Sequence, residues 1–137
     1  MSGLSLSSVA RSSWVHVAFA FVAMGGWALF ANRAHGLSRA VPPALLQGAL
    51  SAGLTFGIKR GIEARFRSLE GLTALIVPPV LSCSIVLALL VGAHTLARTP
   101  EVWATIAVPY AVSSTYAVAY TASLWAARRK ARRHERA

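Results

Sequence analysis

Residues 41–58 read VPPALLQGALSAGLTFGI, 18 residues without a charge, and Lys59 and Arg60 follow at once. As an α-helix rising about 1.5 Å per residue, this stretch would be roughly 27 Å long, close to the thickness of the hydrocarbon core of a bilayer. Two prolines open the stretch, and proline is tolerated in the first turn of a helix because the amides there have no partner within the helix. The stretch therefore predicts a membrane-spanning helix over approximately residues 41–60.

Three further stretches of the chain have the same character. Residues 12–31, 71–93 and 102–127 contain 20, 23 and 26 residues without an Asp, Glu, Lys or Arg. With 55% hydrophobic residues and a mean hydropathy of +0.55, the 137-residue chain is too apolar for an ordinary soluble domain. We expect an all-α membrane protein, a single domain of four transmembrane helices in a compact bundle, at approximately 12–31, 41–60, 71–94 and 102–127, with a basic tail at 128–137.

Two segments carry expectations about shape. Residues 59–70, KRGIEARFRSLE, form a polar connection whose apolar residues follow helical spacing, so a short amphipathic extension is expected there. Pro78 and Pro79 lie inside the third apolar stretch. Proline within a helix removes a backbone hydrogen bond, so a kink is expected at this pair.

The positive charges are divided unequally between the two sides of the expected bundle. If both termini lie on the same side as the connection between the second and third helices, that side carries 11 lysines and arginines and the other carries 3. Because cytoplasmic loops are enriched in these residues, both termini are predicted in the cytoplasm, and we interpret the chain as a multi-pass protein of a bacterial inner membrane. The basic residues expected to contact anionic lipid are Lys59, Arg60, Arg128, Arg129 and Lys130.

Two rows of side chains run along the helix expected at residues 41–60. The first row has a small residue at every fourth position: Ala49, Gly53, Gly57 and Gly61. Small residues let backbones approach closely, so this row predicts helix packing, either within the bundle or between subunits. The second row is polar and lies almost opposite the first: Gln47, Ser51 and Thr55. Between the rows lie Leu50, Leu54 and Ile58, which we expect to face lipid.

The helix expected at residues 102–127 offers partners for the polar row. One of its faces carries Thr105, Pro109, Ser113, Tyr116 and Tyr120. Buried hydroxyls need hydrogen-bond partners, so we expect this face to turn inward toward the polar row. The two rows would then form either a dry polar contact or a water-filled path. The residues that would line such a path are His16, Gln47, Ser51, Thr55, Ser113, Tyr116 and Tyr120.

The sequence offers little for catalysis or for cofactor binding. All four acidic residues lie outside the apolar stretches, so the carboxylate that ion-coupled carriers usually place within the membrane is missing. The four histidines are scattered and Cys83 is the single cysteine, so no metal site, cofactor site or catalytic residue is expected. The basic C-terminal run lacks interleaved aromatic residues, so we expect no nucleic-acid partner.

These observations favour a small inner-membrane protein without enzymatic activity. It would act as a helix-packing or accessory subunit of a membrane assembly, through self-association or with another membrane protein. The alternative is a small homo-oligomeric channel or uniporter for a neutral or anionic solute. A transporter requires the polar residues to line a continuous path, whereas a packing protein pairs them with one another.

The division of positive charge generates the first testable prediction. Reporter enzymes fused after Arg67 and after Ala137 should both report a cytoplasmic location, because the side carrying 11 of the 14 basic residues is retained there. A periplasmic signal from either fusion would contradict the expected arrangement of four crossings.

Overall fold

The structure is a computed structural model that describes the backbone of residues 6–134 and the side chains of residues 14–134. Its elements are α1 (Leu6–Ala31), the short 3-10 helix η1 (Arg33–His35), α2 (Leu37–Ser68), α3 (Gly71–Leu96) and α4 (Val102–His134). All four α-helices are long and apolar enough to cross a membrane. The expectation of an all-helical protein with four helices capable of spanning a membrane is therefore confirmed.

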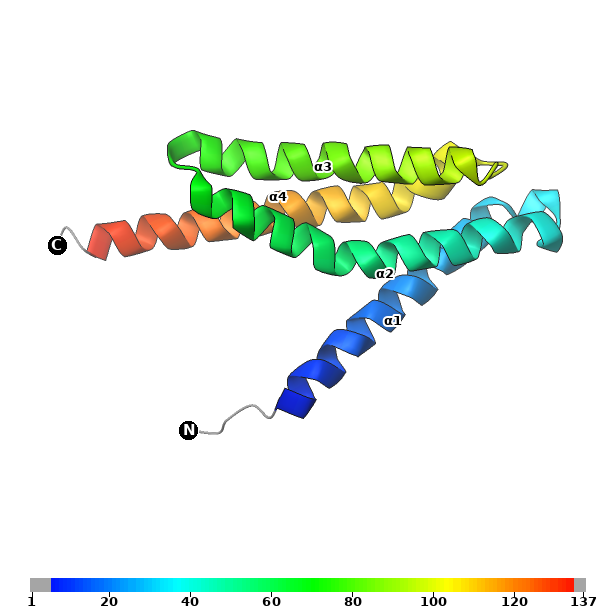
Figure 1. The fold of residues 1–137 in the computed structure, drawn as a ribbon, viewed down its shortest axis with the longest axis horizontal. Coiled ribbons are helices and arrows are strands. Elements are labelled where there is room, and N and C mark those ends of the chain that lie inside the picture. Colours follow the sequence, from blue (N-terminus) through cyan, green and yellow to red (C-terminus); the bar gives the residue numbers. More distant parts are fainter. Residues whose placement is uncertain (1–5, 135–137) are drawn as a thin grey trace.

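The four helices do not contribute equally to the bundle. α2, α3 and α4 lie side by side, whereas α1 contacts α2 and the beginning of α4 along its C-terminal half and diverges toward its N-terminus (Figure 1). The indole N–H of Trp27 in α1 donates to the carbonyl oxygen of Ala104 in α4, over 2.9 Å. α1 is thus attached at one end of the bundle, which is less compact than expected.

Two helices extend well beyond their apolar stretches. α2 begins at Leu37, so Pro42 and Pro43 lie inside the helix rather than opening it, and it continues to Ser68 through the segment expected to be a polar connection. The extension forms because Ile62 and Phe66 lie one turn apart and are both buried. α4 likewise continues through the expected basic tail as far as His134.

α3 is continuous across Pro78 and Pro79, and its ribbon runs straight through them (Figure 1). The expected kink is therefore absent from this helix. Both prolines are buried, so the packing of neighbouring helices around them supports the helix axis where backbone hydrogen bonds are missing.

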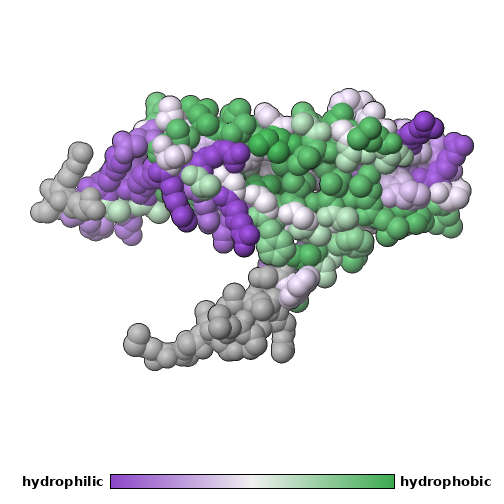
Figure 2. Space-filling view, in the orientation of Figure 1, coloured by the Kyte–Doolittle hydropathy of each residue, from purple (hydrophilic) through white to green (hydrophobic). Residues whose placement is uncertain are grey.

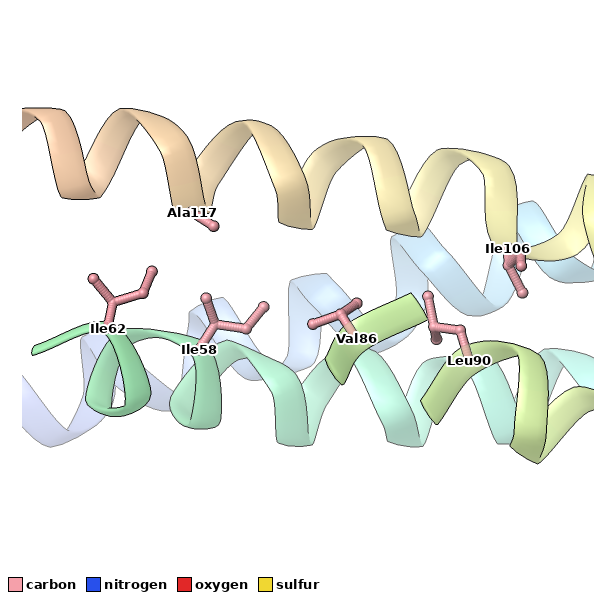
Figure 3. Packing of buried hydrophobic residues seen from close by; sticks show 6 residues of the cluster. All are labelled: Ile58, Ile62, Val86, Leu90, Ile106 and Ala117. Carbon is pink, nitrogen blue, oxygen red and sulfur yellow. The ribbon is translucent and has the colours of Figure 1, made fainter. Parts of the chain in front are cut away.

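The apolar core lies between α2, α3 and α4 (Figure 3). Its buried members are Ile58, Ile62, Val86, Leu90, Ile106 and Ala117. Ile58 belongs to this core and Leu50 and Leu54 pack against it, so the expectation that these three residues face lipid was wrong. The physical reason is that branched apolar side chains fill the space where three helices meet as readily as they face lipid tails.

A close contact between α1 and α2 uses glycines outside the predicted small-residue row. A Cβ atom added to Gly25 of α1 would lie 2.9 Å from the carbonyl oxygen of Ala44 in α2. One added to Gly48 of α2 would lie 2.9 Å from the carbonyl oxygen of Phe21 in α1. The absence of side chains at these two positions is therefore what allows the two backbones to touch.

The predicted small-residue row faces away from the rest of the chain. Ala49, Gly53 and Gly57 are exposed, and a Cβ atom at either glycine would meet nothing within 4 Å. A Cβ atom at Gly61 would meet only Arg65, which is on the same helix. Packing of this row within the bundle was therefore a wrong expectation, because the core formed on the opposite side of α2. Packing between subunits stays a prediction.

The contact at Gly25 can be tested with its neighbour as control. Gly25→Ala should lower the free energy of unfolding by about 1–3 kcal/mol, because the added methyl group forces the backbones of α1 and α2 apart. Gly26→Ala should leave stability unchanged or raise it by up to about 1 kcal/mol, since open space surrounds that position and alanine favours helix. Equal thermal unfolding of the two variants in detergent would contradict the close contact.

Candidate functional site

A group of buried polar side chains lies at the end of the bundle where η1 approaches the connection between α3 and α4. We call this group the polar cluster, and it consists of Asn32, Gln47, His94, Thr99 and Thr105. Each member has a hydrogen-bond partner inside the chain. Uncompensated burial of such groups would cost several kcal/mol each, so the pairing is a condition for the fold.

His94 is the centre of the polar cluster. It is fully buried, with Nε2 at 2.8 Å from Oε1 of Gln47 and Nδ1 at 2.9 Å from Oγ1 of Thr99. An amide oxygen can only accept, so in the neutral ring Nε2 donates to Gln47 and Nδ1 accepts from the Thr99 hydroxyl. The amide nitrogen of Gln47 in turn donates to Ser51, over 2.9 Å. One continuous chain of hydrogen bonds therefore joins α2, α3 and the connection after α3.

Asn32 joins α1 to α4 in the same way. Its side-chain nitrogen donates to the carbonyl oxygen of Ala28 at 2.9 Å and to the hydroxyl of Thr105 at 2.7 Å. Its side-chain oxygen accepts from the backbone N–H of Glu101 at 3.0 Å. The buried side-chain amide of Asn32 thus links the end of α1 to the beginning of α4.

His35 and Glu101 form a contact on the rim of the polar cluster. Nε2 of His35 lies 2.9 Å from Oε1 of Glu101, with both side chains partly exposed. An exposed pair of this kind contributes little to stability, because water screens the charges and both side chains lose freedom.

The polar row of α2 does not pair with α4 as expected. Gln47 is buried, but its partner is His94 of α3. Ser51 is half-buried and accepts from Gln47, while Thr55 is exposed and donates to the backbone carbonyl of Ser51 in its own helix. The row is therefore split between the interior and the outer surface. The reason is that α2 turns its leucine and isoleucine side chains, not this row, toward α4.

The polar face of α4 is divided in a similar way. Thr105 is buried in the polar cluster, whereas Ser113 is half-buried and Tyr116 is 42% exposed. Tyr120 donates to a carboxylate oxygen of Glu63 over 2.5 Å, and its ring stacks on that of Tyr116. Glu63 was missed as a partner because it was assigned to a connection, and only the extension of α2 brings it against α4.

His16 lies on the exposed surface of α1, in the part that diverges from the bundle. The candidate path of seven residues is separated into an interior part around Gln47, an outward part that includes Thr55 and Tyr116, and a pair between Tyr120 and Glu63.

Arg128 holds the opposite end of the bundle. Its guanidinium donates from one nitrogen to the carbonyl oxygen of Leu69 and from the other to that of Phe66, each over 2.7 Å. It also lies over the Phe66 ring, 3.9 Å from the centroid. The last carbonyls of a helix have no partner within it and carry partial negative charge, so a cation at the end of α2 is stabilising. Arg128 is engaged with the protein, while the other four predicted lipid contacts are exposed: Lys59, Arg60, Arg129 and Lys130.

Two residues of the polar cluster carry a sequence signal that could have identified them. Asn32 directly follows the first apolar stretch and His94 directly follows the third, so each lies at the boundary between apolar and polar sequence. Both boundaries fall at the same end of the bundle (Figure 1). This signal indicates that both residues lie near the end of a membrane-spanning stretch. It does not indicate their hydrogen-bond partners, because Thr105 is 73 residues from Asn32 and Gln47 is 47 residues from His94.

The central pair of the polar cluster can be tested by a double-mutant cycle. His94→Phe and Gln47→Leu should each lower the free energy of unfolding by about 1–3 kcal/mol, because each leaves the partner buried without its hydrogen bond. The double variant should lose less than the sum of the two by at least about 0.5 kcal/mol. Thr55→Val should stay within about 0.5 kcal/mol of the parent, since Thr55 is exposed. Additive losses in a detergent unfolding titration would show that the pair is not coupled.

The contacts at both ends of the bundle can fix helices relative to one another.

Among residues 6–134, no group of three or more His, Cys, Asp or Glu side chains is placed to hold a metal ion. Comparisons with protein-family models, with curated proteins and with solved structures found no match to this chain.

Proposed function

We propose that this chain is a helix-packing or accessory subunit of a bacterial inner-membrane assembly and has no enzymatic activity of its own. The observation that carries the proposal is a contrast between interior and surface. The side chains of the polar cluster are hydrogen-bonded to one another and to nearby backbone groups. By contrast, no other helix within residues 6–134 lies against the face of α2 at Gly53 and Gly57. We further propose that both termini lie in the cytoplasm, supported by the division of positive charge.

The pairing of the interior supports a packing role over the alternative of a small channel or uniporter. Gln47 uses both its oxygen and its nitrogen on His94 and Ser51, and Asn32 uses both on neighbouring backbone and side-chain groups. A conducting path needs polar groups that can exchange their partners with water or solute. Because these groups are committed to one another, they serve better as links between helices.

The uncovered face of α2 supports association with another helix. Gly53 and Gly57 are exposed in the region where α1 has diverged from α2 (Figure 1). In lipid, helices associate through close packing rather than through the hydrophobic effect, and small residues permit that packing. A helix from a second copy, or from another membrane protein, can therefore approach α2 here more closely than at faces carrying large side chains.

Association through this face is tested by substituting leucine at Gly57 of α2 and, as a control, at Ala88 of α3. Gly57→Leu should reduce by several-fold the fraction of the chain that is isolated from native membranes in a larger complex, because leucine prevents close approach. It should not weaken the single chain, since a Cβ atom at Gly57 meets nothing within 4 Å in the part of the chain that the structure describes, and leucine favours helix. Ala88→Leu, on the exposed surface of α3, is the matched control and should leave the complex intact.

The size and composition of the complex distinguish the outcomes. A complex containing only multiples of the 14.5 kDa chain would identify self-association, and mass spectrometry of a mixed complex would identify the partner. A parent chain that is isolated only as a monomer would contradict the proposed role. Solute flux through liposomes containing that monomer would favour the transport alternative.

A further inference from the structure

A recess with a strongly basic lining lies where the beginning of α3 meets the C-terminal part of α4. We call it the basic recess, and its volume is about 530 Å³. Its lining consists of Gly71, Leu72, Trp125, Arg128, Arg129, Arg132 and Arg133. Four arginines thus line one recess that has no acidic residue in its lining. Figure 2 shows that the hydrophilic surface at this end of the bundle borders directly on the hydrophobic surface of the helices.

The four arginines are held differently. Arg128 is fixed by the backbone carbonyls at the end of α2, and the guanidinium of Arg129 lies over the Trp125 ring, 4.5 Å from its centroid. Arg132 has a carboxylate oxygen of Glu70 at 3.7 Å, a long contact between two mostly exposed side chains. This pair leaves the guanidinium largely available to another anion, because exposed ion pairs are weak.

The positive charge of the basic recess favours binding of an anion. Like charges held within one small recess repel, and a bound anion removes that repulsion. Arginine suits phosphate in particular, since its planar guanidinium can donate two parallel hydrogen bonds to two phosphate oxygens. The lining therefore indicates a phosphate group as ligand.

The position of the basic recess indicates a lipid as the source of that phosphate. Leu72 lies in the first turn of α3, the most apolar of the four membrane-spanning helices, and Trp125 is of the residue type enriched at membrane interfaces. Both lie in the same lining as the arginines, so one ligand can contact the apolar and the basic residues together. The volume falls within the range of sites for small molecules and greatly exceeds that of a phosphate ion.

We propose that the basic recess binds one anionic phospholipid. Arg129, Arg132 and Arg133 contact its phosphate, while Leu72 and Trp125 contact the glycerol and the upper acyl chain. The site is more selective than general attraction of the basic surface to anionic lipid, because Lys59 and Arg60 on α2 are not part of it. It is independent of the proposed role as a subunit, which concerns a different face of α2.

The site is tested by titrating phosphatidylglycerol into the full-length chain in an uncharged detergent and counting bound lipid by native mass spectrometry. Each basic residue near a membrane surface changes lipid affinity by roughly fivefold, so the triple variant Arg129→Gln, Arg132→Gln and Arg133→Gln should bind about 100-fold more weakly. The matched control is Lys59→Gln, Arg60→Gln and Arg67→Gln, which removes three exposed charges from α2 outside the recess. This control should weaken binding by less than about threefold.

A second variant keeps every charge and fills the recess instead. Leu72→Trp should weaken phosphatidylglycerol binding several-fold, because the larger side chain occupies the space of the lipid. This variant tests the site by itself if the arginine variant fails to fold. Equal weakening by the two triple variants would overturn the proposal in favour of general surface attraction. Displacement of the lipid by millimolar inorganic phosphate would also overturn it, because the recess would then be a site for a small anion. An unchanged affinity in Leu72→Trp would likewise rule out a lipid seated in the recess.

Discussion

The rest of this structure depends on one constraint, which is that polar groups buried within a membrane-spanning bundle must find their partners inside the protein. His94 meets it with one ring nitrogen on Gln47 and the other on Thr99, which fixes α2, α3 and the connection between α3 and α4. Asn32 meets it with three bonds that fix α1 to α4. These links are directional, whereas apolar packing in lipid gives little preference for one helix neighbour over another.

The opposite end of the bundle is held by charged groups instead. Arg128 donates to the carbonyl of Phe66 in the last turn of α2 and to that of Leu69 directly after it, and Tyr120 of α4 donates to Glu63 of the α2 extension. Between the two ends lies an apolar core shared by α2, α3 and α4. Trp27 near the C-terminal end of α1 and Asn32 directly after it bond to α4 and to the connection before α4, whereas α1 diverges from the bundle toward its N-terminus (Figure 1).

Both proposed interactions, with another helix and with a phospholipid, use surfaces that these internal contacts do not cover. Because the groups of the polar cluster are hydrogen-bonded to one another and to nearby backbone, the outer surfaces remain for binding. One such surface is the uncovered face of α2 around Gly57, where small side chains suit a helix. The other is the basic recess between α3 and α4, where arginine beside Trp125 suits a phospholipid. The first concerns association and the second concerns lipid, and they occupy separate parts of the molecule.

The sequence by itself determined that four helices are long and apolar enough to cross a membrane, because length and apolarity are properties of a linear stretch. Only the tertiary structure decided which side of each helix faces inward, since lipid and a protein core accept the same apolar side chains. Ile58 therefore belongs to the core and Leu54 packs against it, while Gly53 and Gly57 face outward. The contacts of His94 with Gln47, of Glu63 with Tyr120 and of Arg128 with the end of α2 were equally beyond sequence reasoning. In each of these contacts the partner is 47 or more residues away along the chain and becomes a neighbour only when the helices pack.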